Sequence, residues 1–148
     1  MVLDFEKFAV KGNEFLHQLE ANLGIEDRAH AARILRSTFR VLRNHLAMEE
    51  SLQLVAQLPM AIKGVYVDGW SAGEYCRITS SEDFILEIIE AEGKSAWRDF
   101  SSQEEILESV RAVIETMRLY VSPEEMNQAL RTLPTRIRQS LETSEETY

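Results

Sequence analysis

The sequence predicts an all-α fold, a compact bundle of about seven helices, and three observations indicate it. Apolar residues recur every three to four positions along almost the whole chain, the spacing that buries one face of an α-helix. Capping serines, glycines and prolines divide the chain into segments of helical length. A pattern in residues 34–66 returns at 109–141, so we expect the bundle to be built from two internal helical repeats.

The first half of the chain is expected to hold helices at about 5–23, 26–46, 48–58 and 59–67. Phe5 and Phe8 belong to the apolar face of the first helix, so we expect both side chains to be buried. Gly24 ends this helix, because glycine readily adopts the left-handed conformation of a helix C-terminus. Pro59 separates the last two helices, because proline cannot continue a helix but suits the first turn of a new one.

The second half begins after a segment without helical spacing. Residues 67–79 contain the turn signal Asp68-Gly69, and we expect them to be irregular or, in part, extended. Ser80 or Ser81 is expected to cap a helix that closes near Gly93. Ser101 or Ser102, each with a glutamate three residues later, caps the next helix, Ser122-Pro123 starts another, and a final helix follows Pro134. A linker that holds Trp97 and Phe100 is expected between the first two of these helices.

The internal repeat is the strongest long-range signal in the sequence. At an offset of 75, residues 34–66 and 109–141 share eight identities in 33 positions without a gap. The pattern Glu-Glu-x-x-Gln-x4-Leu-Pro-x-x-Ile begins at Glu49 and again at Glu124, and amphipathic character alone does not require it. Chance resemblance between amphipathic helices is the alternative. We expect one helical domain over residues 1–142, with repeats at about 26–66 and 101–141, and a flexible acidic tail at 143–148.

Composition excludes several classes of protein. The 148 residues hold 25 acidic and 16 basic side chains, and the resulting net charge of −9 disfavours nucleic acid and anionic membranes as partners. No apolar run is long enough to cross a bilayer. The single cysteine, Cys76, excludes an internal disulfide and a multi-cysteine metal site, so we expect a cytoplasmic protein.

Residues 57–70 resemble the signature of a known family. The run Gln57-Leu58-Pro59, followed by Gly64-Val65-Tyr66-Val67-Asp68-Gly69-Trp70, is similar to that of DUF2267, a family of bacterial domains of unknown function. The resemblance extends over about residues 4–142; Ala47-Met48 departs from the Ser-Pro helix start of the second repeat. It implies a small all-helical cytoplasmic domain, and it implies no reaction.

No catalytic group, metal site or cofactor site is expected. Glu14 with His17, and Asp27 with His30, have the spacing of di-iron ligands, but neither pair lies on the apolar face of its helix. The glutamate pairs at helix starts are expected to interact with unsatisfied backbone amides. No nucleophile or base has an orienting partner nearby in the sequence, so the sequence predicts a non-enzymatic protein.

Arginines form one candidate binding surface. Four of them follow helical spacing opposite the apolar stripe of the second helix, and no acidic residue intervenes between 28 and 48; they are Arg33, Arg36, Arg40 and Arg43. Arginine side chains match carboxylates and phosphates, so the stripe would suit an acidic partner or a phosphate-bearing ligand. The other interpretation, which we favour, is a solvated face that the excess acids of the chain neutralise.

Aromatic residues form the other candidate. Tyr66, Trp70 and Tyr75 cluster around Asp68-Gly69 between the repeats. They would line a pocket or partner surface, or they would fill the seam between the two halves, which we favour. The sequence therefore predicts a non-enzymatic module that binds another protein. The alternative is a domain that binds a small molecule or an anion in an aromatic and arginine pocket near Trp70.

Overall fold

The computed structural model describes residues 3–71 and 80–141, and every regular element in these ranges is helical. The elements are α1 Phe5–Leu23, α2 Arg28–His45, α3 Met48–Ala56, α4 Met60–Val67, α5 Ser81–Glu92, the 3₁₀ helix η2 Gly93–Ser95, α6 Ala96–Asp99, α7 Gln103–Met117, α8 Pro123–Leu130 and α9 Thr135–Leu141. The all-α prediction is confirmed. The expected acidic tail, and the expected extended piece with Tyr75 and Cys76, lie outside the described residues.

Local capping chemistry sets the helix ends. Gly24 lies at φ 72° after α1, and Ser102 and Ser122 accept backbone hydrogen bonds at the starts of α7 and α8, as the sequence indicates. The departure concerns residues 93–99, which form η2 and α6 instead of a linker. Phe100, which follows α6, is buried in the apolar core. Its burial holds the short helices against the body.

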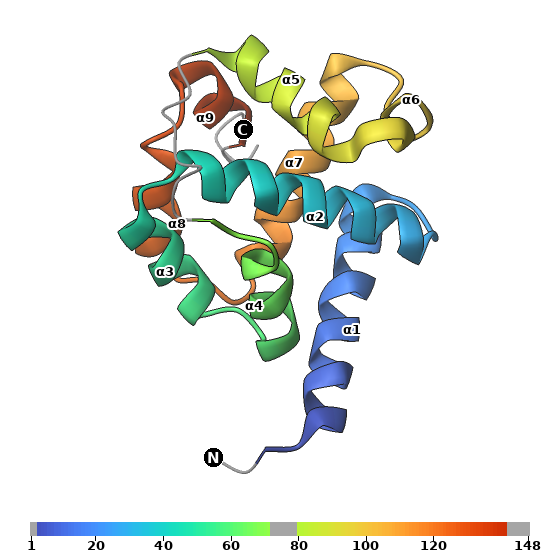
Figure 1. Ribbon diagram of the computed structural model, residues 1–148, viewed down its shortest axis with the longest axis vertical. Coiled ribbons are helices and arrows are strands. Elements are labelled where there is room, and N and C mark those ends of the chain that lie inside the picture. Colours follow the sequence, from blue (N-terminus) through green and yellow to red (C-terminus); the bar gives the residue numbers. More distant parts are fainter. Residues whose placement is uncertain (1–2, 72–79, 142–148) are drawn as a thin grey trace, which may run out of the picture.

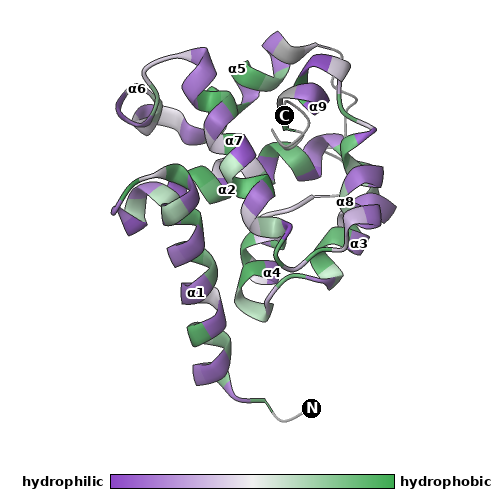
Figure 2. Cartoon of the chain, turned by 180° about the vertical axis from the view of Figure 1, so that it is seen from behind, coloured by the Kyte–Doolittle hydropathy of each residue, from purple (hydrophilic) through white to green (hydrophobic). Residues whose placement is uncertain are grey.

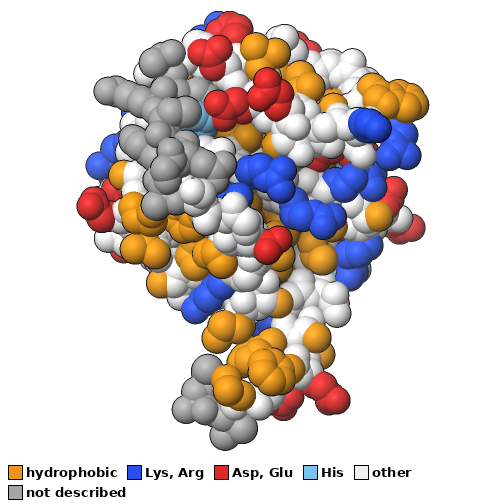
Figure 3. Space-filling model, viewed as in Figure 1, with side chains coloured by type: hydrophobic (Ala, Val, Ile, Leu, Met, Phe, Trp, Pro, Cys, Tyr) orange, Lys and Arg blue, Asp and Glu red, His pale blue; other side chains and the backbone are white. Residues whose placement is uncertain are grey.

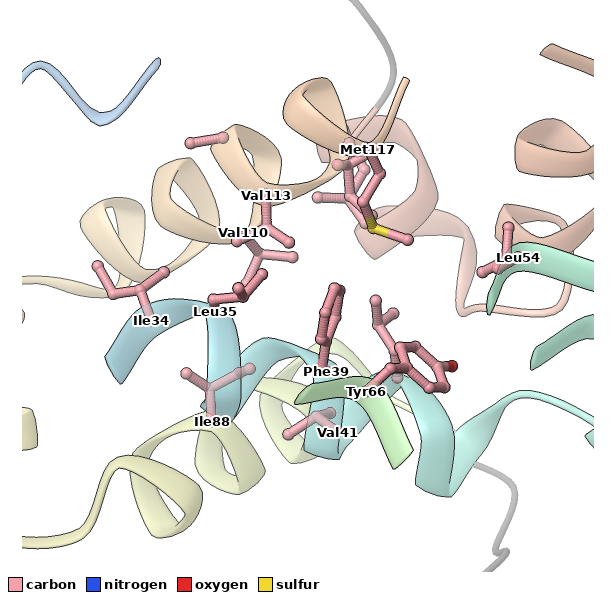
Figure 4. Close-up of a cluster of buried hydrophobic side chains, with 14 of the residues drawn as sticks. Ile34, Leu35, Phe39, Val41, Leu54, Tyr66, Ile88, Val110, Val113 and Met117 are labelled. Carbon is pink, nitrogen blue, oxygen red and sulfur yellow. The ribbon is translucent and has the colours of Figure 1, made fainter. Parts of the chain in front are cut away.

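The helices surround one apolar core. In Figure 1, α2 crosses the middle of the molecule with α7 behind it, and these two helices contact each other. Phe39 of α2 points toward Val110, Val113 and Met117 of α7, and the ring of Tyr66 from α4 lies beside Phe39 (Figure 4). Burial of these large side chains supplies the main driving force for folding.

The two halves of the chain place their helices at matching positions. Helices α2, α3 and α4 begin at residues 28, 48 and 60, and α7, α8 and α9 begin 75 residues later, at 103, 123 and 135. Helix α2 packs against α7, and α3 against α8, so each contacts the helix at the matching position in the other half. The predicted offset is the same. That the two halves have one shape stays a prediction, as does the single domain over 1–142.

The first helix extends beyond the core. Its C-terminal half packs through the buried Phe15 and Leu19, whereas its N-terminal end projects from the body (Figures 1 and 2). The expectation that Phe5 and Phe8 are buried is wrong for Phe5, which is 74% exposed, and Phe8 is only half-buried. Helical spacing selects the face of a helix, but it does not show where the neighbouring helices end. Where α4 does cross α1, Gly12 leaves no room for a side chain, because a Cβ there would lie 2.9 Å from that of Ala61.

Candidate functional site

The exposed side of α2 carries basic residues that the sequence indicated as a candidate binding surface. Asp27 caps this helix by accepting a hydrogen bond from the backbone N–H of His30, and the helix continues to His45. Arg36 and Arg40 are exposed one turn apart, and Figure 3 shows Lys and Arg side chains gathered across the face that α2 presents. Within the described residues, neither arginine has an ion-pair or hydrogen-bond partner for its side chain. We call Arg36 and Arg40, with Arg33 at their edge, the basic face.

Arg33 is held by a carboxylate from the other half of the chain. Its Nε and NH2 atoms each donate a hydrogen bond of 2.8 Å to Asp99 of α6, a bidentate pair. Asp99 is only 3% exposed, and the Nε2 atom of His30 lies 3.7 Å from it. The pair therefore neutralises Arg33 and fastens α6 to α2, while it leaves the positive charges of Arg36 and Arg40 unopposed.

A second carboxyl group lies beside this pair. Oε1 of Glu92, the last residue of α5, accepts a hydrogen bond of 2.9 Å from the Ser37 hydroxyl, and its buried Oε2 receives none from the described residues. Burial, together with the neighbouring Asp99 carboxylate, raises the pKa of Glu92 from 4.5 to about 7. The hydrogen bonds from Arg33 lower the pKa of Asp99 from 3.8 to about 2. In the folded protein Glu92 therefore keeps a proton up to near-neutral pH, and Asp99 does not.

This difference makes stability depend on pH. Between pH 4.5 and about 7 the folded chain keeps a proton on Glu92 that the unfolded chain has released, so the free energy of unfolding is expected to fall as pH rises through this range. The fall should be on the order of 1 kcal/mol, because Glu92 is only half-buried and water screens its charge. The contribution of Asp99 is present above pH 3.8 and is lost only as pH falls toward 2.

Glu92→Gln tests this expectation, because glutamine resembles the protonated acid. Urea unfolding at pH 5, 6, 7 and 8 should show the decline in the wild type and little of it in the variant. The matched control is Glu90→Gln, which removes an exposed acid from the same helix. A wild-type decline that persists in Glu92→Gln would assign the pH dependence to another group.

Arg43 does not belong to the basic face, contrary to its predicted position on the outer stripe. It is 5% exposed, and its NH1 atom donates hydrogen bonds of 3.0 Å and 2.6 Å to the backbone oxygens of Tyr66 and Asp68. The reason is that α4 packs against α2 and brings its C-terminal carbonyls over this position. Arg43 therefore satisfies the end of α4 and is not available to a partner.

The predicted aromatic cluster lies at this same end of α4. Tyr66 is fully buried, its hydroxyl lies 2.7 Å from the Ser51 hydroxyl, and its ring centroid is 4.9 Å from that of Phe39. The half-buried Trp70 packs edge-on against Tyr66 at 5.8 Å. Tyr75 lies outside the described residues. Tyr66 and Trp70 thus pack against each other, and these contacts lie within the first half of the chain. That the aromatic residues fill the seam between the two halves stays a prediction.

Sequence reasoning missed the surface around Trp97. This side chain is 78% exposed and borders a mainly apolar groove of about 490 Å³ between α5, α6 and the start of α7. A single tryptophan in an expected linker gives no periodic signal, so the groove could not be read from the sequence. The described residues contain no group of three or more His, Cys, Asp and Glu side chains arranged for a metal ion.

Comparison with known protein families gives one match that covers most of the chain. The sequence profile of DUF2267, described as an uncharacterized conserved protein, matches residues 12–140 of the 148. The chain belongs to the DUF2267 family. The match confirms the resemblance found in residues 57–70, and it spans the basic face, the Glu92–Asp99 pair and the groove. Among the curated proteins, none matches the chain.

No helix in the described part of this DUF2267 protein combines the length and the apolar character that a membrane span requires. The family assignment carries no activity with it. Function must therefore be argued from the surface of the molecule itself.

Proposed function

We propose that this protein is a non-enzymatic interaction module whose basic face binds an acidic segment of another protein. The observation that carries the proposal is the exposed pair Arg36 and Arg40, which has no acidic partner within the described residues. In a chain with a net charge of −9, such a pair has an abundant supply of carboxylates and yet is not paired with them.

The chemistry of the two side chains supports an acidic peptide as the ligand. A guanidinium presents donors in a planar fork that matches a carboxylate bidentately, as Arg33 does with Asp99. Arg36 and Arg40 are separated by one helical turn, so their side chains are neighbours on the helix surface. A partner with acidic residues at a similar spacing would pair with both. We place this interaction in the cytoplasm, because a protein with a single cysteine forms no internal disulfide and so needs no oxidising environment.

The alternative function, anion binding in a pocket near Trp70, would need polar groups that are already hydrogen-bonded within the protein. Arg43 donates to the carbonyls of Tyr66 and Asp68, and the Tyr66 hydroxyl is paired with Ser51. The Arg43 NH1 group and the Tyr66 hydroxyl are thus engaged inside the protein and not by a ligand beside Trp70. The exposed basic face is therefore the better-supported site.

Affinity capture from the host cell with matched charge variants tests the proposal. The double variant Arg36→Glu/Arg40→Glu reverses the charge of the basic face. The control Lys11→Glu/Arg131→Glu makes the same change in net charge at exposed positions on α1 and after α8. We expect at least one protein to be recovered with the wild type and with Lys11→Glu/Arg131→Glu but not with Arg36→Glu/Arg40→Glu. Identical sets of recovered proteins from all three, with circular dichroism showing that all are folded, would contradict the proposal.

A further inference from the structure

The Glu92 carboxyl group lies beside the Arg33–Asp99 pair, at the edge of the basic face. Glu92 contacts Ser37, which adjoins Arg36 in the sequence, and it shares its surroundings with Asp99, the partner of Arg33. Burial of a carboxyl oxygen that receives no hydrogen bond, as with Oε2 of Glu92, favours the protonated form over the anion. The Glu92 carboxyl group therefore adjoins Arg33, at the edge of the basic face, and the segment of α2 that carries Arg36.

We infer that Glu92 is a proton switch that regulates the basic face: with its proton the face binds an acidic partner more tightly, and without it more weakly. The inference rests on the proposed function of the basic face. Its structural basis is the three-way arrangement of Arg33, Asp99 and Glu92, in which one arginine faces two carboxyl groups. With Glu92 neutral, the charges of Arg33 and Asp99 cancel. Once Glu92 ionises, one uncompensated negative charge remains beside Arg33, at the edge of the face.

The elements packed against α5 also carry charged groups. From α2, Arg33 and Ser37 act on Glu92 directly, and the Nε2 atom of His30 lies 3.7 Å from Asp99. From α7, Glu105 and Glu108 line a small pocket with His30. From α9, Arg136 pairs with Glu82 at the opposite end of α5, and Lys94 of η2 is exposed. Asp99 of α6 is therefore the carboxylate that opposes ionisation of Glu92.

The size of the effect follows from Coulomb's law. One charge at about 10 Å from each bound carboxylate, in the partly screened surroundings of a protein surface, changes the binding constant by roughly two- to fourfold. The pKa of about 7 places the change between pH 6 and 8. Binding of an acidic peptide should therefore weaken by this factor from pH 6 to pH 8.

Isothermal titration calorimetry with a deca-aspartate peptide measures the change in the binding constant directly, because aspartate side chains do not titrate between pH 6 and pH 8. The wild type should bind two- to fourfold more weakly at pH 8 than at pH 6, and Glu92→Gln should bind equally at both. His30→Asn is the matched control, since histidine side chains also titrate in this range; it should keep the dependence. A ¹³C NMR titration of the Glu92 carboxyl should show its midpoint near pH 7.

The outcomes separate the two proposals. No binding at pH 6 by the wild type would overturn the basic face as a site for acidic segments, and the switch with it. Binding that does not change with pH would overturn the switch alone. So would a dependence that persists in Glu92→Gln or disappears in His30→Asn, because the titrating group would then be another one. A Glu92 midpoint below pH 5 would also overturn it.

Discussion

Arg43→Leu is expected to lower the free energy of unfolding by about 3 kcal/mol. Arg43 is buried and is the donor to the backbone oxygens of Tyr66 and Asp68 at the end of α4. Leucine keeps part of the side-chain volume but leaves both carbonyls without this charged donor, and an unsatisfied buried carbonyl, such as that of Tyr66, is costly. Urea unfolding at pH 6, read by circular dichroism, measures the change.

Arg40→Leu is the matched control, because Arg40 lies about one turn earlier on the same helix and is exposed. We expect this substitution to change the free energy of unfolding by no more than about 0.5 kcal/mol. Equal effects of the two substitutions would show that Arg43 is not the structural residue that its contacts indicate.

The second large effect is expected at Tyr66. Tyr66→Ala removes a fully buried ring that contacts Phe39 and Trp70, and it should cost about 3–5 kcal/mol. Tyr66→Phe keeps the ring and removes only the hydroxyl that pairs with Ser51, so it should cost about 1 kcal/mol. Urea unfolding of both variants measures the two contributions separately.

A loss below 1 kcal/mol in Tyr66→Ala would contradict a structural role for Tyr66 in the packing of α4 against α2 and α3. In that case the aromatic cluster would be available for a ligand. A large loss in Tyr66→Phe, close to that of Tyr66→Ala, would instead place most of the stabilisation in the hydrogen bond to Ser51.

Local signals in the sequence were sufficient for the longer helices, but not for η2 and α6 or for the positions of the arginines. Capping by Ser102 and Ser122 and the αL glycine at Gly24 act within a few residues, so they can be read directly from the sequence. Arg43 and Arg36 follow the same helical spacing, yet one is buried and the other exposed. The difference arises because α4 covers the end of α2, and a one-dimensional pattern does not contain that contact.

The Arg33–Asp99 pair shows the same limit at longer range. Its members are 66 residues apart, and Asp99 lies in a segment that the sequence indicated as a linker. Nothing in the spacing of either residue points to the other. The pKa of Glu92 depends on this pair, so the proton switch could not be inferred before the three-dimensional arrangement was known.

The measurement that tests the central claim most directly is a ¹H–¹⁵N NMR titration of the labelled protein with the deca-aspartate peptide at pH 6. If the basic face is the binding surface, the largest chemical-shift changes should be those of the Arg36 and Arg40 side-chain Nε–H groups and of the α2 backbone amides around them. The Trp97 indole N–H, the Arg131 Nε–H group and the amides of α8 should change little. Saturable changes centred on those last groups, with Arg36 and Arg40 unaffected, would contradict the account.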